Sequence, residues 1–212
     1  MDSKIKKRRL QDILIIILAL AVFILTLIHW RAGNMEFIYY GILTFIISIP
    51  FIFFFYRKIG ISTPLLIGMS LLVIVNLCAG GIVKVGGVRL YDWILIKLFY
   101  IDSEFTAIKF DQIVHAYGGF ICSMVIFRFM KYFNKEIRFN SSFFIFIAAL
   151  AGFGAASFYE VVEFVATFFK INGVGGYHNT LLDMISNFIG ALISIPILMR
   201  VERRKKRGVN RN

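Results

Sequence analysis

The chain has 212 residues, of which 59% are hydrophobic and 17% are aromatic, and its mean hydropathy is +0.79. A soluble domain of this size needs far less apolar surface for its core, so the composition excludes a soluble globular protein and predicts a membrane protein. The formal net charge of +12 does not indicate nucleic-acid binding, because the basic residues stand in short clusters between apolar runs.

The first apolar run resembles a secretory signal only superficially. It extends unbroken over residues 13–28 and ends in His-Trp-Arg. A cleaved signal has an apolar region of about 7–15 residues, followed by small residues at the cleavage site. We therefore expect this run to be the first membrane helix.

Six apolar runs are long enough to cross a bilayer, since a helix needs about 20 apolar residues to cross a hydrocarbon core of roughly 30 Å. The predicted spans are residues 13–30, 37–56, 64–82, 112–130, 143–169 and 181–199. The fifth span is longer than one crossing requires, so it must tilt or project beyond the bilayer. The pattern predicts an all-α fold: a polytopic membrane helix bundle of about six transmembrane helices, forming a single transmembrane domain over residues 1–212.

The positions of Lys and Arg predict the orientation, because cytoplasmic segments retain these residues. With the N-terminus inside, 18 of the 24 basic residues fall in cytoplasmic segments. We therefore expect a multi-pass protein of the cell (inner or plasma) membrane, with its N- and C-termini in the cytoplasm. The long connection 83–110 then lies outside, and its aromatic, amphipathic stretch 91–100 is typical of a segment on the membrane interface. An ordinary ordered loop is the alternative, and the connection 172–180 is also predicted as an outer loop.

Three pairs of polar residues stand inside the predicted spans or at their edges. Ionisable residues in a span cost on the order of 2.5–3.5 kcal/mol or more, so each needs an explanation. Both members of each pair share one helical face, because they are three or four residues apart. The pairs are Asp111 with His115, Glu160 with Glu163, and Asp183 with Asn187. In the predicted topology all three reach a similar depth, so we expect one polar pocket that opens to the extracytoplasmic side.

Each of these residues also has a purely structural interpretation. Asp111 and Asp183 could favour helix N-termini through the helix macrodipole. Glu160 and Glu163 could form a structural hydrogen-bonded network, and His115 alone would be an ordinary buried histidine. Next to several carboxylates, however, the imidazole becomes a candidate ligand or acid–base group.

The second half of the chain resembles a known family. The segments concerned read Phe-Asp-Gln-Ile-Val-His-Ala-Tyr-Gly-Gly at 110–119, Tyr-Glu-Val-Val-Glu at 159–163 and Leu-Asp-Met-Ile-Ser-Asn-Phe-Ile-Gly-Ala at 182–191. They resemble bacterial YjdF-type inner-membrane proteins. More distantly they are similar to VanZ-like proteins, whose pattern is Asp-x-x-x-His, then Glu-x-x-Gln, then Asp-x-x-x-Asn-x-x-Gly.

The resemblance implies a multi-pass bacterial or archaeal membrane protein in which the polar residues at 111, 115, 160, 163, 183 and 187 form the shared site. It supplies no reaction, because the YjdF-type family is uncharacterised. The chain departs from the VanZ-like pattern in two ways: Glu163 stands where Gln is usual, and no Arg precedes Asp183 closely.

Three functions remain open from the sequence. The first is an intramembrane enzyme that acts on a lipid or lipid-linked envelope molecule at the outer leaflet. Its candidate catalytic residues are Glu160, Glu163, His115, Asp111, Asp183 and Asn187. A divalent metal ion could be held by His115, Glu160, Glu163 and Asp183, or the Glu pair could perform metal-free acid–base chemistry.

The second function is a proton- or cation-coupled transporter that uses the same acids, although no broken helix and no duplicated half is visible in the sequence. The third is a structural or accessory membrane protein in which the acidic cluster is a stability network. Membrane lipids and a lipid-linked substrate are the expected partners, and nucleic acid is not.

Overall fold

The computed structural model describes residues 2–101, 104–133, 141–169, 171 and 176–209. Its α-helices are α1 (Asp2–Arg31), α2 (Met35–Leu43), α3 (Ile49–Phe54), α4 (Thr63–Ala79), α5 (Phe110–Phe133), α6 (Ser141–Phe168) and α7 (Tyr177–Val209). The π-helical turn η1 (Thr44–Ser48) joins α2 to α3, and a second one, η2 (Phe55–Ile59), follows α3, so Met35–Ile59 is one continuous helical segment. Within the described residues, five helices are long and apolar enough to cross a membrane, and α4 is a shorter apolar helix. The predicted all-α polytopic bundle is therefore confirmed.

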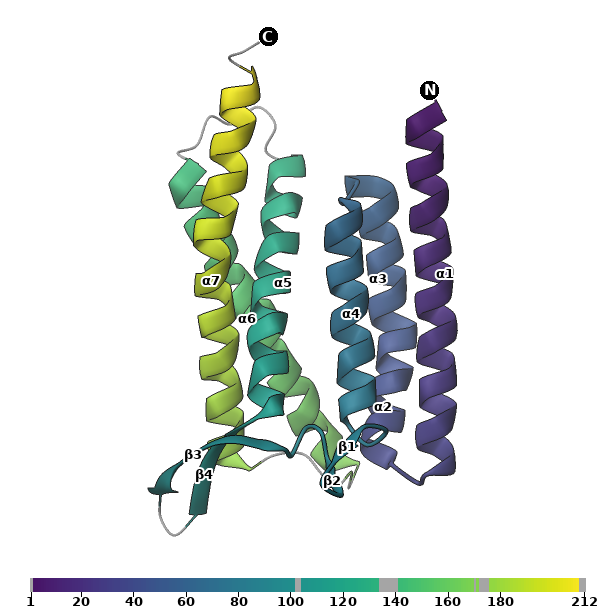
Figure 1. Cartoon of the computed structure of the whole chain (residues 1–212), viewed down its shortest axis with the longest axis vertical. Helices are drawn as coiled ribbons and strands as arrows, with labels where there is room; N and C mark the ends of the chain where they lie inside the picture. The colour runs from purple at the N-terminus through teal and green to yellow at the C-terminus, as the bar shows by residue number, and fades with distance from the viewer. Residues whose placement is uncertain (1, 102–103, 134–140, 170, 172–175, 210–212) are drawn as a thin grey trace.

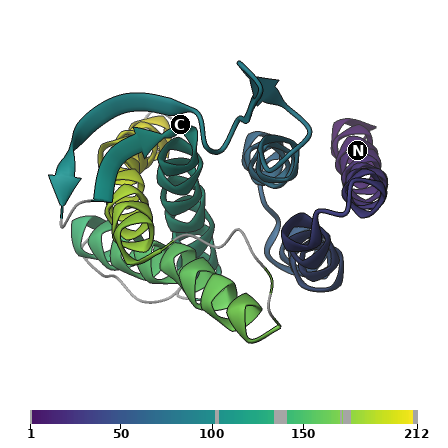
Figure 2. The same ribbon diagram turned by 90° about the horizontal axis from the view of Figure 1, so that it is seen from below.

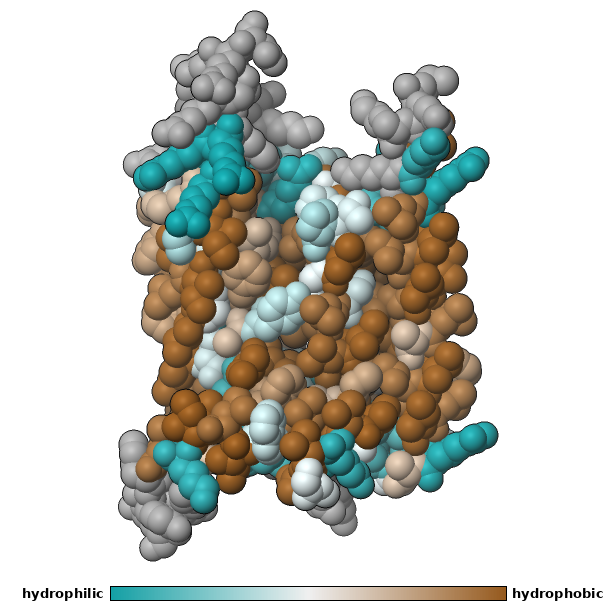
Figure 3. Space-filling view, viewed as in Figure 1, coloured by the Kyte–Doolittle hydropathy of each residue, from teal (hydrophilic) through white to brown (hydrophobic). Residues whose placement is uncertain are grey.

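The outer surface of the bundle is apolar along most of its length. Large side chains such as Ile16, Phe23, Ile46 and Phe164 are more than half exposed. Figure 3 shows this surface as a brown band between teal, hydrophilic residues at the two ends of the molecule. Such an exposed apolar band is compatible with lipid rather than water around the protein.

The helices form two groups that lie side by side (Figures 1 and 2). One group contains α1 to α4 and the other contains α5, α6 and α7, which pack closely against one another. The long helix α6 is inclined to its neighbours α5 and α7 (Figure 1), which agrees with the expectation for its excess length. The helix α4 packs against α5 and so connects the two groups.

The second span departs from regular α-helix near Pro50, the second residue of α3. Proline has no backbone N–H and cannot complete the α-helical hydrogen-bond ladder. The π-helical turn η1 lies directly before α3, and π-turns of this kind occur often at functional sites.

The long connection 83–110 forms two β-hairpins instead of a loop. Strands β1 (Lys84–Val85) and β2 (Val88–Arg89) pair through Gly86 and Gly87, both of which have positive φ angles, as a tight two-residue hairpin turn requires. Strands β3 (Ile94–Ile101) and β4 (Glu104–Lys109) form the second hairpin. The stretch 91–100 is therefore largely a strand, although its expected position at the membrane surface stays a prediction.

Both hairpins lie at one end of the bundle, whereas α1 begins and α7 ends at the opposite end (Figure 1). Helix α5 starts directly after β4, and α7 starts at Tyr177, inside the connection 172–180 that the sequence predicts as a loop. Residues 172–175 of that connection lie outside the described part of the chain. The polar ends of α5 and α7 therefore meet at the end of the bundle that carries the hairpins.

Candidate functional site

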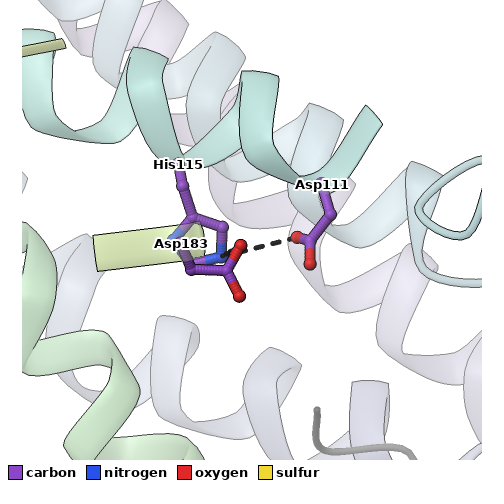
Figure 4. Close-up of side chains that lie close together, drawn as sticks. All are labelled: Asp111, His115 and Asp183. Carbon is purple, nitrogen blue, oxygen red and sulfur yellow. Dashed lines mark ion pairs between the residues drawn. The ribbon is translucent and has the colours of Figure 1, made fainter. Parts of the chain in front are cut away.

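His115 lies at the centre of a cluster of carboxylates. Its side chain is 9% exposed, and its Nε2 atom lies 3.4 Å from Oδ1 of Asp111 and 3.9 Å from Oδ1 of Asp183. Asp111 and His115 stand one turn apart on α5, and Asp183 comes from α7 (Figure 4). The predicted convergence of these two helices at their polar residues is what the structure shows.

Two side-chain amides hold the carboxylate of Asp183, which is only 1% exposed. Gln112 donates from Nε2 to Oδ1 at 2.6 Å, and Asn179 donates from Nδ2 to Oδ2 at 2.5 Å. The Oε1 atom of Gln112 accepts the backbone N–H of Lys109 at 2.7 Å, which fixes the orientation of this amide. Asn179 also reaches Oδ2 of Asp111 at 3.4 Å and so connects the two aspartates.

Gln112 and Asn179 were not among the residues that the sequence predicted. Asn179 falls in the connection that was expected to be a loop, so its spacing of four residues from Asp183 did not predict a contact between the two side chains. Because α7 extends back to Tyr177, the side chains of Asn179 and Asp183 lie on the same helical face.

Glu160 approaches the opposite side of the imidazole. Its Oε1 atom lies 3.3 Å from Nδ1 of His115, and Nδ2 of Asn187 lies 3.4 Å from the same ring nitrogen. Glu160 is 8% exposed, and within the described part of the chain neither of its carboxylate oxygens has a hydrogen-bond partner. Burial of a carboxylate without hydrogen bonds is costly, so its contact with Nδ1 of His115 at 3.3 Å is the interaction that can offset this cost.

Glu163 occupies a different place from the other predicted residues. It lines a polar pocket at the end of the bundle with the hairpins, together with Glu36, Arg89, Asp92 and Asp111. Asp111 belongs both to this outer pocket and to the cluster around His115. Five of the six predicted residues therefore meet at His115, and Glu163 lies in the adjoining pocket.

Ion pairs cross-link the outer pocket. Arg89 binds Oε2 of Glu36 at 2.9 Å through Nη1 and Oδ2 of Asp92 at 2.6 Å through Nε, and Nζ of Lys109 lies 3.9 Å from Oδ1 of Asp92. Burial lowers the pKa of Arg89, but the hydrogen bonds and charges of Asp92 and Glu36 outweigh burial and hold it above its ordinary value. Glu36 was not among the predicted site residues, because the predicted span begins at residue 37, whereas α2 begins at Met35.

A second, mainly apolar cavity of about 260 Å³ lies on the other side of His115. It is bounded by residues of the second span and of α4, α5, α6 and α7, so both helix groups contribute to it. Asn76 and Tyr159 line both this cavity and the outer pocket. The cluster around His115 thus stands between a polar space and an apolar one.

Two glycines allow α5 and α7 to approach so closely. Gly119 of α5 lies against the backbone carbonyl of Asn187, and Gly190 of α7 lies against the backbone carbonyl of Ala116. A side chain at either position would collide with main-chain atoms, which cannot move aside as a flexible side chain can. Small residues of this kind are the usual means of close helix packing in membranes.

Asp111, His115 and Asp183 fit a divalent metal ion. Each offers one ligand atom, and these atoms lie within 4.8 Å of one another. Ligand atoms around a tetrahedral zinc ion with bonds of about 2.0–2.2 Å lie roughly 3.3–3.6 Å apart, close to the 3.4 and 3.9 Å measured from Nε2 of His115. Catalytic zinc sites commonly have three protein ligands and one open position.

The surroundings of these three residues also suit metal ligands. A histidine ligand usually donates its second ring N–H to a carboxylate, a backbone carbonyl or water, and Nδ1 of His115 faces the carboxylate of Glu160. A ligating carboxylate is usually hydrogen-bonded in turn, as Asp183 is by Gln112 and Asn179.

The family model described as "Predicted membrane protein (DUF2238)" matches residues 12–204. No curated protein and no solved structure matches the chain. Because the family model spans most of the chain, from the first membrane helix to the end of the last, the protein belongs to the DUF2238 family of predicted membrane proteins.

Proposed function

We propose that this protein is a membrane-embedded enzyme that uses a divalent metal ion to act on a lipid or lipid-linked molecule at the outer leaflet of the cell membrane. One observation carries the proposal: the Asp111, His115 and Asp183 cluster stands between the polar outer pocket and the apolar cavity. An amphiphilic substrate has its reactive polar group next to its hydrocarbon part, so its polar–apolar junction fits this position.

The residues of the cluster have distinct roles in this proposal. Asp111, His115 and Asp183 would hold the ion through one oxygen, Nε2 and one oxygen, respectively. Bound there, a divalent ion supplies Lewis-acid polarisation and lowers the pKa of a coordinated water molecule. The negative charge of Glu160, 3.3 Å from Nδ1 of His115, would favour the tautomer that carries its proton on Nδ1, which leaves the lone pair of Nε2 facing the two aspartates.

The proposed ligand set differs from the one expected from the sequence, which contained Glu160 and Glu163 in place of Asp111. Glu160 faces Nδ1 of His115, whereas Asp111 and Asp183 face Nε2. Glu163 lines the outer pocket, where it is placed to exchange a proton with a bound polar group. Its role is therefore that of an acid or base and not of a ligand.

The proposed location and orientation rest on charge. The basic clusters 4–9 and 200–207 belong to the start of α1 and the end of α7, which lie at the same end of the bundle. Cytoplasmic segments retain such clusters, so that end is proposed to be cytoplasmic and the candidate site to open at the opposite, outer surface. A YjdF-type protein of the bacterial inner membrane would have this arrangement.

Metal titration tests the proposal. Purified protein in detergent is stripped with a chelator and titrated with Zn²⁺ and with Mn²⁺ by calorimetry. We expect one site in the wild type and a loss of affinity of at least about 100-fold in His115→Gln and in Asp183→Asn, since each removes a ligand. Asp92→Asn is the matched control, because Asp92 pairs with Arg89 outside the cluster.

Equal titration curves for the wild type and the three variants would overturn the metal site.

The reaction itself is tested by incubating the metal-loaded protein with a total lipid extract of a bacterial membrane and analysing the lipids by mass spectrometry. A lipid that changes only with the loaded wild type supports the enzyme. If the metal-loaded protein leaves every lipid unchanged, the metal ion has a structural role and the proposed enzymatic activity is wrong.

A further inference from the structure

The apolar cavity has a definite depth below the candidate site. On α5 its lining extends from Val114 and His115 to Cys122. Seven residues of α-helix separate His115 from Cys122, which corresponds to about 10 Å at a rise of about 1.5 Å per residue. The cavity therefore extends along α5 over about one third of the thickness of a hydrocarbon core of roughly 30 Å.

Its volume of about 260 Å³ limits what can occupy it. A dry apolar cavity of about 150 Å³ in a soluble protein accommodates one benzene ring. The cavity here is less than twice that size, so it has space for a segment of one hydrocarbon chain and not for two chains lying side by side.

The second span supplies an unusual wall. Thr44 and Ser48, the first and last residues of the π-helical turn η1, both line the cavity. A π-turn places an extra residue in the helix and changes which side chains face inward, and such turns are frequent at ligand sites. The opposite wall is built from small residues of α6, Ala155 and Ala156, which leave the volume open.

The apolar cavity and the polar pocket share lining residues. His115 borders the cavity, Asp111 borders the pocket, and Asn76 and Tyr159 border both. A molecule that places a polar group beside Asp111 and Glu163 would therefore direct its apolar part past Tyr159 toward Cys122.

We propose that this cavity binds a single hydrocarbon chain of the substrate, with the polar group of the same molecule at the Asp111, His115 and Asp183 cluster and the chain directed at Cys122. The inference rests on the proposed function for the reaction, but the chain site can be tested without it. It restricts the substrate class to amphiphiles that present one chain, such as a single-chain lipid phosphate.

Cys122 provides a natural reporter for the depth of the chain. In a Cys78→Ser background, Cys122 is the one remaining cysteine of the sequence. The probes are alkyl phosphates with a maleimide at the far end of the chain, in a series of increasing chain length. Mass spectrometry of the intact protein follows the addition of the thiol to the maleimide. We expect the labelling rate to peak at the chain length that spans about 10 Å and to fall about tenfold, equivalent to about 1.4 kcal/mol, for the shortest and the longest chains.

Two adjacent positions on α6 give a matched pair of variants. Ala155→Phe fills the cavity, whereas Gly154→Phe projects into open space, since a Cβ at Gly154 meets nothing within 4 Å. The labelling rate of Cys122 should fall about tenfold or more in Ala155→Phe, which again corresponds to about 1.4 kcal/mol. It should stay unchanged in Gly154→Phe. Ser48→Phe blocks the cavity from the opposite wall and serves if Ala155→Phe does not fold.

Labelling that is independent of chain length, or equal in the Ala155→Phe, Ser48→Phe and Gly154→Phe proteins, would overturn the chain site. Equal reaction with short, water-soluble N-ethylmaleimide would do so as well, because it would show a water-filled space. A probe with an uncharged alcohol in place of the phosphate, used on the metal-stripped protein, separates this inference from the proposed function: its labelling of Cys122 should show the same dependence on chain length without the metal ion. Metal binding without length-dependent labelling removes only the chain site, and labelling without metal binding removes only the metal enzyme.

Discussion

Gly190 of α7 lies directly against the main chain of Ala116 of α5, at a point where a Cβ atom on the glycine would overlap the carbonyl oxygen of Ala116. Gly119 of α5 has the reciprocal relationship with the carbonyl of Asn187. On α5 both contacts lie within about one helical turn after His115, at Ala116 and Gly119, so they set the separation at which His115 meets Asp183 and Asn187. The positions of the polar residues and of the glycines are thus parts of one packing arrangement.

We therefore expect Gly190→Ala to disturb the site through the backbone. The added methyl group must push α7 away from α5, and overpacking of this kind costs typically about 1–3 kcal/mol. Thermal melting in detergent should show a lower melting temperature, and metal titration should show weaker binding. Gly154→Ala is the control, since a Cβ there meets nothing within 4 Å. Wild-type melting and metal affinity in Gly190→Ala would contradict the close approach.

Much of the fold could be predicted from hydropathy alone. Each predicted span overlaps one observed helix or continuous helical segment, because a run of about 20 apolar residues has few alternatives to a membrane helix. The π-turns and the two hairpins were not predicted. The stretch 91–100 is rich in aromatic and β-branched residues, which suit a strand as well as an interfacial segment, and only its pairing with β4 distinguishes the two.

The site was predictable to the extent that it depends on helical spacing. Asp111 with His115 and Asp183 with Asn187 share helical faces, and topology alone brings these pairs to the same end. Which nitrogen of His115 faces which acid depends on the rotation of α5 against α6 and α7, and no periodicity in the sequence specifies that rotation. For the same reason the separate location of Glu163 could not be deduced from its spacing to Glu160.

Replacing Glu160 by Gln should separate function from stability. The amide has nearly the same shape, but the buried negative charge 3.3 Å from Nδ1 of His115 is removed. Since the carboxylate has no hydrogen bond within the described part of the chain, the melting temperature of the metal-free protein should stay the same or rise. Metal affinity should fall, because a neutral partner makes the imidazole a weaker ligand. A protein that melts earlier and binds metal normally would show that Glu160 is a structural residue.

Arg89 and Glu36 should be coupled in stability. Arg89→Met leaves the carboxylate of Glu36, whose side chain is 11% exposed, without its bound guanidinium. Loss of a charged hydrogen bond of this kind costs about 1.5–3 kcal/mol, so the variant should melt at a lower temperature. Adding Glu36→Gln removes the unpaired charge and should recover part of the loss. Independent, additive effects of the two substitutions would show that the ion pair does not stabilise the outer end of the bundle.

Both ends of the chain should face the cytoplasm. Alkaline phosphatase fused after Asn212 should be inactive and a fluorescent protein there should be bright, because the basic cluster 200–207 retains that end inside. The same phosphatase inserted between Gly86 and Gly87, in the exposed turn between β1 and β2, should be active. Active phosphatase at Asn212 would invert the orientation and place the candidate site at the inner leaflet.

The amide of Asn179 should act as a positioning group for the metal ligands. It donates to Oδ2 of Asp183 and reaches Oδ2 of Asp111, so it fixes the relative orientation of both carboxylates without being a ligand itself. Loss of such a partner typically reduces metal affinity by about 10–100-fold, and we expect Asn179→Ala to show a loss in this range by calorimetric titration. Asn34→Ala is the matched control, because the Asn34 amide donates to the carbonyl of Gly80 and lies outside the cluster. A structural role would lower the melting temperature of both variants and leave both metal affinities unchanged, whereas a positioning role lowers the metal affinity of Asn179→Ala alone.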